Sequence, residues 1–373
     1  MPTHTADVII LGAGIAGASA AYELSTTHRV LLLEREPQPG LHSTGRSAAI
    51  FTEIYGNQIV RALSRATRNF LFNPPGGFAD APLVSPRATL FIAPREQVGA
   101  LHAIRDDADV RAGTEPMTTA EAIARVPILR PDHVVEALYE PGASDIDVNG
   151  LHQAFLRGFK QRGGRLVCNV KIEALEPKWR AHTDDETFEA PIVVNAAGAW
   201  ADEVARLAGA RALGIQPKRR TVVLLDAPKE HDIRNWPLVI DASETFYFKP
   251  DAGRILLTPA DETPSEPCDA QPDEMDMALA IDRFEAATTM SVRRIAHKWA
   301  GLRSFAPDRT PVVGFDRHAA GFFWLAGQGG YGMQTSSAMA RTASALVRGE
   351  DVPADIAQEG VTARALSPAR FPS

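Results

Sequence analysis

The sequence predicts an α/β protein, α+β when the whole chain is considered, with a Rossmann-like unit at its N-terminus. The chain has 373 residues, of which 45% are hydrophobic and 23% charged, enough for two or three domains with a substantial core. A strand, a glycine turn, a helix and a second strand are expected within residues 7–34. The last third of the chain returns to alternating strands and a helix. A disordered chain and a small disulfide scaffold are therefore excluded.

Charge and cysteine content narrow the classes of partner. The chain carries 39 Lys and Arg against 46 Asp and Glu, a net charge of −7, so we expect no nucleic-acid surface. Cys168 and Cys268 are too few and too far apart for a disulfide framework or a zinc site, and we expect no metal. No window has the 18 or so uninterrupted apolar residues that would span a bilayer. These features predict a cytoplasmic protein without a transmembrane segment.

Hydrophobic spacing and turn residues predict the remaining elements. Residues 37–57 are rich in Gly, Ser and Thr and have no period, which is typical of a long functional loop. Helices are expected at residues 58–73, stopped by Pro74 and Pro75; at 148–162, capped by Asp147; and at 274–288 and 333–348. Strands are expected at 88–92, 166–170, 191–195, 220–225, 244–249, 254–258, 298–305, 311–314 and 321–326.

Gly12, Gly14 and Gly17 form a G-x-G-x-x-G pattern directly after the first apolar strand. The first glycine allows the tight turn, the second lets the backbone approach a pyrophosphate, and the third lets the helix pack on the strand. Glu34 ends the second strand, where a carboxylate accepts hydrogen bonds from ribose hydroxyls and repels the 2′-phosphate of NADP. A glycine turn used only for packing is the alternative. The pattern favours binding of FAD or NAD.

The position of the glycine unit favours FAD. It is followed by the loop at residues 40–49 and not by a second half that would complete a nicotinamide site. Far downstream, residues 193–200 form an apolar strand that ends in small residues, where the backbone can approach a cofactor. The chain resembles the D-amino-acid oxidase superfamily of flavoproteins, and within it the bacterial D-arginine dehydrogenases. The resemblance covers nearly the whole chain and rests on residues 42–49 (HSTGRSAA), 195–200 (NAAGAW), 216–220 (QPKRR), 246–247 (FY), 299–305 (WAGLRSF) and 328–332 (QGGYG).

The resemblance implies two domains and a non-covalently bound FAD. The FAD-binding domain is expected from the discontinuous segments 1–80, 145–215 and 300–373. Segments 81–144 and 216–299 are expected to form an antiparallel-sheet substrate domain. The residues expected to bind FAD are Gly12, Gly14, Gly17, Glu34, Arg35, Thr44, Gly45, Arg46, Ser47, Ala48, Val170, Ala197, Gly198, Trp200, Gly301, Gly329, Gly330, Tyr331, Gly332 and Met333.

Arg220 and Arg303 are the arginines that chemistry singles out for a substrate. Each lies on or beside an apolar strand, where an unpaired guanidinium is costly, so each needs an anionic partner. A substrate carboxylate can be that partner, and a structural ion pair within the chain is the alternative. The resemblance places both arginines on the substrate carboxylate.

The resemblance also assigns other groups around the substrate. It puts the hydroxyls of Tyr247 and of Tyr55, the latter on a mobile lid, near the same carboxylate. It gives the backbone carbonyl of Gly330 to the substrate amine. The helix that begins near Met333 is expected to direct its N-terminus at the flavin pyrimidine ring and to stabilise negative charge there.

Two departures from the D-arginine dehydrogenases bear on the side chain of the substrate. Thr89 stands where those enzymes have a glutamate that pairs with the guanidinium of the substrate, and Ile50 stands where they have a histidine. We therefore expect a neutral wall and a preference shifted from cationic to neutral side chains, unless Glu53 supplies a replacement carboxylate. His152 and His297 are expected to be core or surface residues without a catalytic role.

The expected reaction is FAD-dependent oxidative deamination of D-amino acids, with hydride transfer to flavin N5, to imino acids and then 2-oxo acids. The alternatives are oxidation of a secondary amine or an N-substituted amino acid on the same fold, an NAD-dependent dehydrogenase, and a non-catalytic flavoprotein subunit. The electron acceptor stays open between oxygen, a quinone and a dye.

Overall fold

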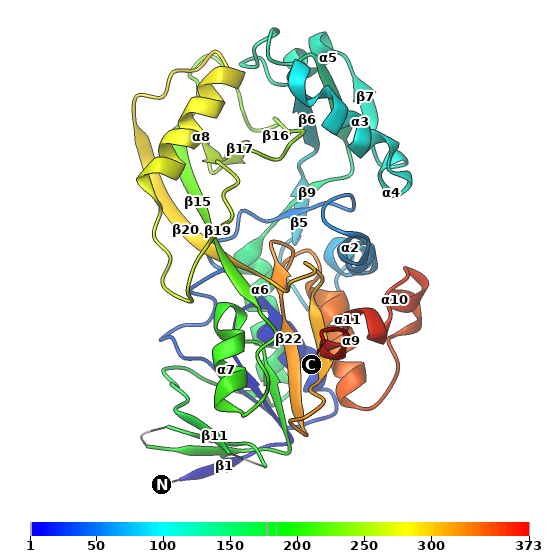
Figure 1. Cartoon of the computed structure of the whole chain (residues 1–373), viewed down its shortest axis with the longest axis vertical. Coiled ribbons are helices and arrows are strands. Elements are labelled where there is room, and N and C mark those ends of the chain that lie inside the picture. Colours follow the sequence, from blue (N-terminus) through cyan, green and yellow to red (C-terminus); the bar gives the residue numbers. More distant parts are fainter. Residues whose placement is uncertain (1, 177, 184, 373) are drawn as a thin grey trace.

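A six-stranded sheet organises one half of the molecule in the computed structural model, which describes residues 2–176, 178–183 and 185–372 (Figure 1). Its first five strands in spatial order are parallel and the last, β21, is antiparallel. In that order the strands are β10 (Arg165–Val167), β3 (Val30–Leu33), β2 (Val8–Leu11), β14 (Ile192–Asn195), β22 (Phe322–Ala326) and β21 (Val312–Phe315).

Helices and a small sheet bury both faces of this sheet. Alternate residues of β2 and β14 pack either against α1 (Ile15–Leu24), α6 (Val148–Gln161) and α9 (Ser336–Val347) or against α7 (Ala201–Leu207) and a four-stranded sheet. Strands buried on both faces explain why their sequences are continuous apolar runs. The strands of the four-stranded sheet are β1 (Thr3–Thr5), β13 (Thr187–Glu189), β12 (Arg180–His182) and β11 (Ala174–Glu176).

A second, larger sheet organises the other half of the molecule. All its strand pairs are antiparallel except β16 with β6, which are parallel. The expected antiparallel sheet is therefore confirmed, with one parallel pair, β16 and β6. In spatial order the strands are β23 (Gln328–Gly329), β20 (Ile295–Phe305), β15 (Gln216–Asp226), β18 (Arg254–Thr258), β17 (Tyr247–Asp251), β16 (Leu238–Asp241), β6 (Thr89–Ala93), β8 (Glu136–Glu140) and β7 (Glu115–Met117), with β19 (Thr263–Pro264) paired to β15.

One face of the large sheet is a closed core, and the other is partly open. The closed face packs against α8 (Glu274–Ala287) and α5 (Thr119–Arg125). The other face contacts α3 (Val98–Asp106) at one end, and the rest of it borders the cavity described below. Strands β15 and β20 are long and run from the large sheet toward the half that holds the six-stranded sheet (Figure 1).

The remaining elements connect or cover these layers. A three-stranded sheet lies between the two large sheets in the view of Figure 1. Its strands are β4 (Ile50–Phe51), β9 (Ser144–Ile146) and β5 (Val84–Pro86), and the other helices are α2 (Gln58–Phe72), α4 (Ala108–Arg111), α10 (Ala354–Gln358) and α11 (Ala363–Leu366), with short 3₁₀ turns at Arg95–Gln97, Gly198–Trp200 and Pro368–Arg370.

The predicted fold class is confirmed, but several predicted boundaries are wrong. Strand β15 begins at Gln216 and not at residue 220, and β20 at Ile295 and not at residue 298. Three other wrong boundaries have a local cause. Strand β17 begins at Tyr247 and not at residue 244, because the Asp241 carboxylate accepts hydrogen bonds from the N–H groups of Thr245 and Phe246 and holds a turn before the strand. Strand β10 ends at Val167, since the chain turns at Asn169, whose φ is +60°.

The third wrong boundary is the start of α9. The helix begins at Ser336, because residues 332–335 form turns in which the Thr335 N–H bonds to the Tyr331 carbonyl. The expected division into two discontinuous domains stays a prediction.

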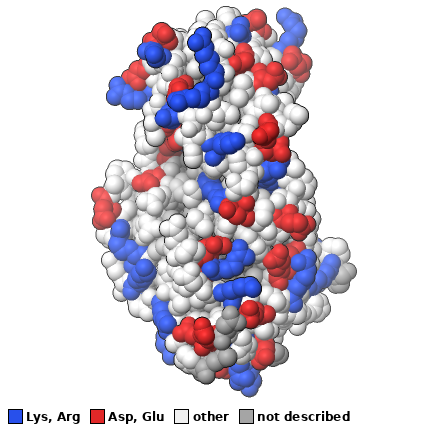
Figure 2. Space-filling view, turned by 90° about the vertical axis from the view of Figure 1, so that its left-hand side faces the viewer, with Lys and Arg blue, Asp and Glu red and all other residues white. Residues whose placement is uncertain are grey.

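On the face shown in Figure 2, Lys and Arg side chains are interspersed with Asp and Glu side chains. In the part of the chain that the structure describes, no helix is both long and apolar enough to cross a bilayer.

Candidate active site

A single elongated cavity links the two halves of the molecule. One end lies at the carboxyl ends of β2 and β3, where Gly12, Gly14 and Glu34 line it. The other end lies on the open face of the large sheet, where Arg220 and Arg303 line it. Crevices beyond the carboxyl ends of parallel strands are the usual place for dinucleotides in such sheets.

The glycines at the first end permit close backbone packing. Gly12 has a φ of +98°, and a Cβ built on it would lie 2.6 Å from the Ala196 carbonyl oxygen. A Cβ on Gly17 would lie 1.8 Å from the Gly12 carbonyl oxygen, so α1 can approach β2 only with glycine there. Gly14 differs, since a Cβ there would meet only the Thr44 hydroxyl, at 3.1 Å, and would otherwise extend along the cavity wall.

Glu34 and Thr44 hold the glycine turn from its two sides. Glu34 Oε2 accepts a hydrogen bond from the Ala13 N–H at 2.8 Å, and its Oε1 accepts from the Glu36 N–H at 3.0 Å. Thr44 Oγ1 accepts from the Ile15 N–H at 3.0 Å. A narrow backbone cradle that a Cβ would fill, opening into a long cavity, fits the pyrophosphate and extended shape of FAD.

The long loop after β3 fastens the cofactor end to the large sheet. Ser43 Oγ donates to the Leu302 carbonyl at 2.6 Å, and the Arg46 guanidinium donates to the carbonyls of Ala300 and Ala270 at 2.9 and 3.0 Å. Arg46 also pairs with Asp269. The loop therefore orders one wall of the cavity, with the head of Arg46 directed to backbone carbonyls.

All the residues expected to bind FAD line this cavity except three. Gly17 packs α1 on β2, as described above. A Cβ on Gly45 would lie 2.6 Å from the Gly40 carbonyl oxygen, so this glycine serves a turn within the loop. Tyr331 packs its ring between Tyr55 and Phe305. Contact of the others with FAD stays a prediction.

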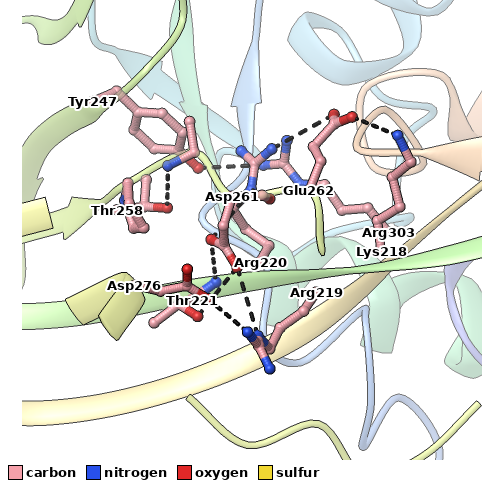
Figure 3. A network of polar contacts seen from close by, with 12 residues as sticks. Lys218, Arg219, Arg220, Thr221, Tyr247, Thr258, Asp261, Glu262, Asp276 and Arg303 are labelled. Carbon is pink, nitrogen blue, oxygen red and sulfur yellow. Dashed lines mark hydrogen bonds and ion pairs between the residues drawn. The ribbon is translucent and has the colours of Figure 1, made fainter. Parts of the chain in front are cut away.

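Arg220 lies on β15 and is 6% exposed. Its Nε donates to the Asp261 carbonyl at 2.8 Å, and its guanidinium lies 4.0 Å from the Asp261 carboxylate and 3.8 Å from Glu262. Burial, together with the charge of nearby Arg303, lowers the pKa of Arg220. Both carboxylates have other partners, because Glu262 also pairs with Lys218 at 2.9 Å and Asp261 caps the Thr221 N–H (Figure 3).

Arg303 lies on the neighbouring strand β20, with its guanidinium beside that of Arg220 (Figure 3). Its Nη2 donates to the Tyr247 hydroxyl at 3.2 Å. Among the described residues, no carboxylate lies within the 4.0 Å of an ion pair with Arg303. The structure thus brings two guanidinium groups together and leaves one of them without an anion.

The two predicted tyrosines lie beside this pair. Tyr247 is buried on β17, and although burial raises the pKa of its hydroxyl, the charges of Arg303 and Arg220 outweigh this and lower it. Burial raises the pKa of Tyr55, and the nearby charges of Arg303 and Glu244 act on it in opposite directions. A Cβ on Gly330 would lie 2.9 Å from Arg303 Nη1, so a side chain there would displace the head of the arginine. The mobility of a lid at Tyr55 stays a prediction.

The wall at the far end of the large sheet is not neutral. Thr89 and Ile50 line it as expected, but so does Glu140, which is 4% exposed. Both its carboxylate oxygens lie within hydrogen-bond distance of Thr52 Oγ1, at 2.7 and 2.9 Å. Glu53 does not line the cavity and pairs with Arg68 at 3.3 Å, so the alternative of a replacement carboxylate at Glu53 is wrong. Glu140, in contrast, comes from β8 and lines the cavity.

The histidines agree with their expected roles. His152 is buried with its Nε2 2.9 Å from the Ala13 carbonyl oxygen, and burial lowers its pKa. His297 is exposed on β20. Neither lines the cavity.

Sequence reasoning missed Glu140 and Glu244. Glu140 ends strand β8, whose sequence has no unusual feature. The only local signal for it is that Glu136, Leu138 and Glu140 alternate onto one face of the strand, with Glu140 at the inward end. Glu244 stands in a turn before β17 with a φ of +54°, exposed and outside the cavity lining.

Comparison with known proteins shows which proteins this chain is similar to. A family model described as FAD dependent oxidoreductase matches residues 7–346. Glycine oxidase from Geobacillus kaustophilus is 25% identical over 395 residues, which cover 96% of this chain and 97% of that protein. Its crystal structure has a TM-score of 0.81 over 95% and 98% of the two chains, at 21% identity.

Two further solved structures share the fold. L-Proline dehydrogenase from P. horikoshii has a TM-score of 0.82 and 21% identity over 99% of this chain and 98% of that one. Iminodiacetate oxidase from Chelativorans sp. has a TM-score of 0.80 and 21% identity over 97% and 98%. These relatives do not support the narrower resemblance to D-arginine dehydrogenases.

Proposed function

Because the chain belongs to the family of FAD-dependent oxidoreductases, we propose that it oxidises the carbon–nitrogen bond of a D-amino acid. FAD is its cofactor, and the enzyme acts on a small amine or amino acid. Our proposal goes beyond this in three respects: the substrate has the D-configuration, its amine is primary, and the residues named below bind it.

The observation that supports an amino-acid substrate most strongly is the Arg303 guanidinium. It is held inside the cavity by the Tyr247 hydroxyl, beside a second guanidinium, with no carboxylate of the described chain in ion-pair range. A buried cation of this kind is stabilised by an anion that enters with the substrate. A planar fork of donors suits a carboxylate held by two hydrogen bonds.

The proposed roles follow from this arrangement. Arg303 and Arg220 bind the substrate carboxylate, and the hydroxyls of Tyr247 and Tyr55 fix its orientation. The Gly330 carbonyl accepts a hydrogen bond from the substrate amine. Together these contacts hold the α-carbon toward the glycine-lined part of the cavity, where positioning contributes most of the catalysis.

When bound in this cavity, FAD would supply the acceptor, its N5 atom, for the hydride that leaves the substrate α-carbon. The lone pair of a neutral amine assists the departure of the hydride, so no side-chain base is required. The product is an imino acid, which water hydrolyses to a 2-oxo acid and ammonia. Residues 332–334, which line the cavity just before α9, are proposed to help the helix stabilise the negative charge that develops.

The D-configuration rests on the resemblance of the arginine and tyrosine set to that of the D-arginine dehydrogenases. A second candidate is a secondary amine or N-substituted amino acid. Two proteins of the same fold support this candidate: iminodiacetate oxidase and L-proline dehydrogenase are named for substrates that are secondary amines. Cys168 and Cys268 are both free thiols, which supports the cytoplasm as the proposed location. The electron acceptor stays open between oxygen, a quinone and a dye.

Anaerobic flavin reduction tests the proposal. The purified yellow protein is mixed with a panel of D-amino acids, their L-enantiomers, sarcosine and iminodiacetate, and the loss of the flavin absorbance near 450 nm is followed. Faster reduction by D-amino acids than by all the others supports the proposal. Reduction by N-substituted amino acids alone establishes the second candidate.

A further inference from the structure

The far wall of the cavity holds a buried carboxyl group that the proposed reaction does not use. Glu140 ends β8 and lines the cavity together with Thr89 and Leu238. Thr89 pairs with Glu140 across β6 and β8, and with Leu238 across β6 and β16. Directly paired residues share one face of a sheet, so these three side chains form a row across the floor of the cavity.

A second row lies beside the first and leads to the arginines. Tyr247 pairs with Ile240, and Ile240 with Phe91, and all three line the cavity. The strands of Tyr247 and Glu140 are three strand spacings apart, on the order of 14 Å between their backbones. A molecule held by its carboxylate at Arg303 therefore needs a side chain several bonds long to reach Glu140.

The charges at the two ends are complementary. No Lys, Arg or His of the described chain forms an ion pair with Glu140, whose carboxylate accepts from the Thr52 hydroxyl. The Glu53 N–H and the Thr89 hydroxyl are near enough to favour its charged form. Burial raises the pKa of Glu140 to about 7, because the hydroxyl and amide donors do not compensate for lost hydration. Among the described residues, the part of the cavity on the large sheet thus has a guanidinium without an anion on β20 and a carboxyl without a cation on β8.

We propose that Glu140 determines side-chain specificity, and that the substrate is an amino acid whose side chain ends in a cationic hydrogen-bond donor, an amino or guanidinium group. This rests on the proposed function and gives it a substrate class. It replaces the expectation of a neutral side-chain preference, because the carboxylate absent at Thr89 is supplied from the paired position on the next strand. Glycine and sarcosine are too short to reach Glu140 from Arg303.

The experiment compares D-lysine and D-arginine with D-norleucine, a neutral amino acid with a side chain of similar length. Anaerobic flavin reduction gives kcat/KM for each on the wild type, Glu140→Gln and Glu136→Gln. Glu136 is the matched control: it lies on the same strand, bonds to His102 at 2.7 Å and does not line the cavity. Glutamine keeps an acceptor for Thr52 and removes the charge.

The wild type is expected to prefer D-lysine or D-arginine to D-norleucine by at least tenfold, and Glu140→Gln to reduce that preference at least tenfold. Glu136→Gln should leave it within twofold. A wild type that prefers D-norleucine overturns the proposal without any variant, and so does a Glu140→Gln protein with an unchanged preference.

Failure of the proposed function gives a different result. Rapid reduction by D-norleucine with no preference for cations supports amino-acid oxidation and overturns only the role of Glu140. If no amino acid reduces the flavin, the proposed function fails. The role of Glu140 is then decided by titrating D-lysine and D-norleucine against the flavin absorbance spectrum. Binding of D-lysine at least tenfold tighter in the wild type than in Glu140→Gln supports it, and equal binding overturns it.

Discussion

At the cofactor end of the cavity, Gly12, Gly14 and Glu34 come from one strand–helix–strand unit, whereas at the substrate end Arg220, Arg303 and Glu140 come from three strands far apart in the sequence. The first group is positioned by local backbone geometry, because a Cβ on Gly12 would meet the Ala196 carbonyl directly after β14 and the Glu34 carboxylate accepts from the Ala13 N–H. The second group is positioned by strand order and register in the large sheet. A local sequence motif therefore identifies the cofactor end, whereas the substrate end can be identified only from the assembled sheet.

The largest expected effect concerns the cofactor end. Gly14→Val should abolish retention of FAD, since the side chain would occupy the cavity beside Thr44 where the backbone meets the pyrophosphate. The protein should fold, because Gly14 has no backbone atom within 4 Å of an added Cβ. The ratio of flavin to protein after purification and the circular dichroism spectrum measure the two effects.

A matched control sharpens this prediction. Gly142→Ala adds a Cβ where nothing lies within 4 Å and should leave flavin content unchanged. A Gly14→Val protein that is fully loaded with FAD would show that the glycine turn serves only to pack α1 on β2.

The second prediction concerns the arginines. Arg303→Met should lower kcat/KM by about 2 to 5 kcal/mol in activation free energy, the range for removing one side of a buried charge pair. Arg220→Met should act in the same direction, and the flavin spectrum should persist in both. Arg254→Met, an exposed arginine on β18 paired with Asp226 at 3.4 Å, is the control. Losses below tenfold in both variants would remove the basis for a carboxylate clamp.

The two ends of the cavity are not equally predictable from the sequence, because one is positioned by local geometry and the other by sheet register. The strand, glycine turn and helix at residues 8–24 were predictable, because periodicity and glycine geometry act over a few residues. Arg220 and Arg303 were identifiable as buried cations, but their proximity depends on the pairing of β15 with β20. Glu140 was not identifiable, since its importance arises only where β8 pairs with β6 and brings it opposite Thr89.

The third prediction uses the pKa of Glu140. Because its folded-state pKa of about 7 lies above its ordinary value of 4.5, the native protein retains a proton that the unfolded chain loses between these pH values. The free energy of unfolding therefore falls as the pH rises from 4.5 to 7, by roughly 3 kcal/mol at most, given about 1.4 kcal/mol for each pKa unit. Glu140→Gln removes this loss.

The measurement is the difference in unfolding free energy between the wild type and Glu140→Gln, from urea titrations at pH 5 and pH 8. The variant should gain stability relative to the wild type at pH 8. A difference that does not change with pH would mean that Glu140 ionises as freely as an exposed glutamate.

The smallest expected effect is that of Tyr55, where the two ends of the cavity meet the long loop. The charges of Arg303 and Glu244 act on its hydroxyl. Its ring packs on that of Tyr331 at a centroid distance of 5.3 Å. Tyr55→Phe keeps the ring and removes one hydrogen-bonding group, so kcat/KM should fall by about 1 kcal/mol, roughly fivefold. The loss should appear in KM if Tyr55 orients the carboxylate equally in the bound substrate and in the transition state. Tyr139→Phe, on β8 but outside the cavity, should leave both constants unchanged. A loss confined to kcat would instead assign Tyr55 to the chemical step, and the substrate end would then depend on the loop as well as on the sheet.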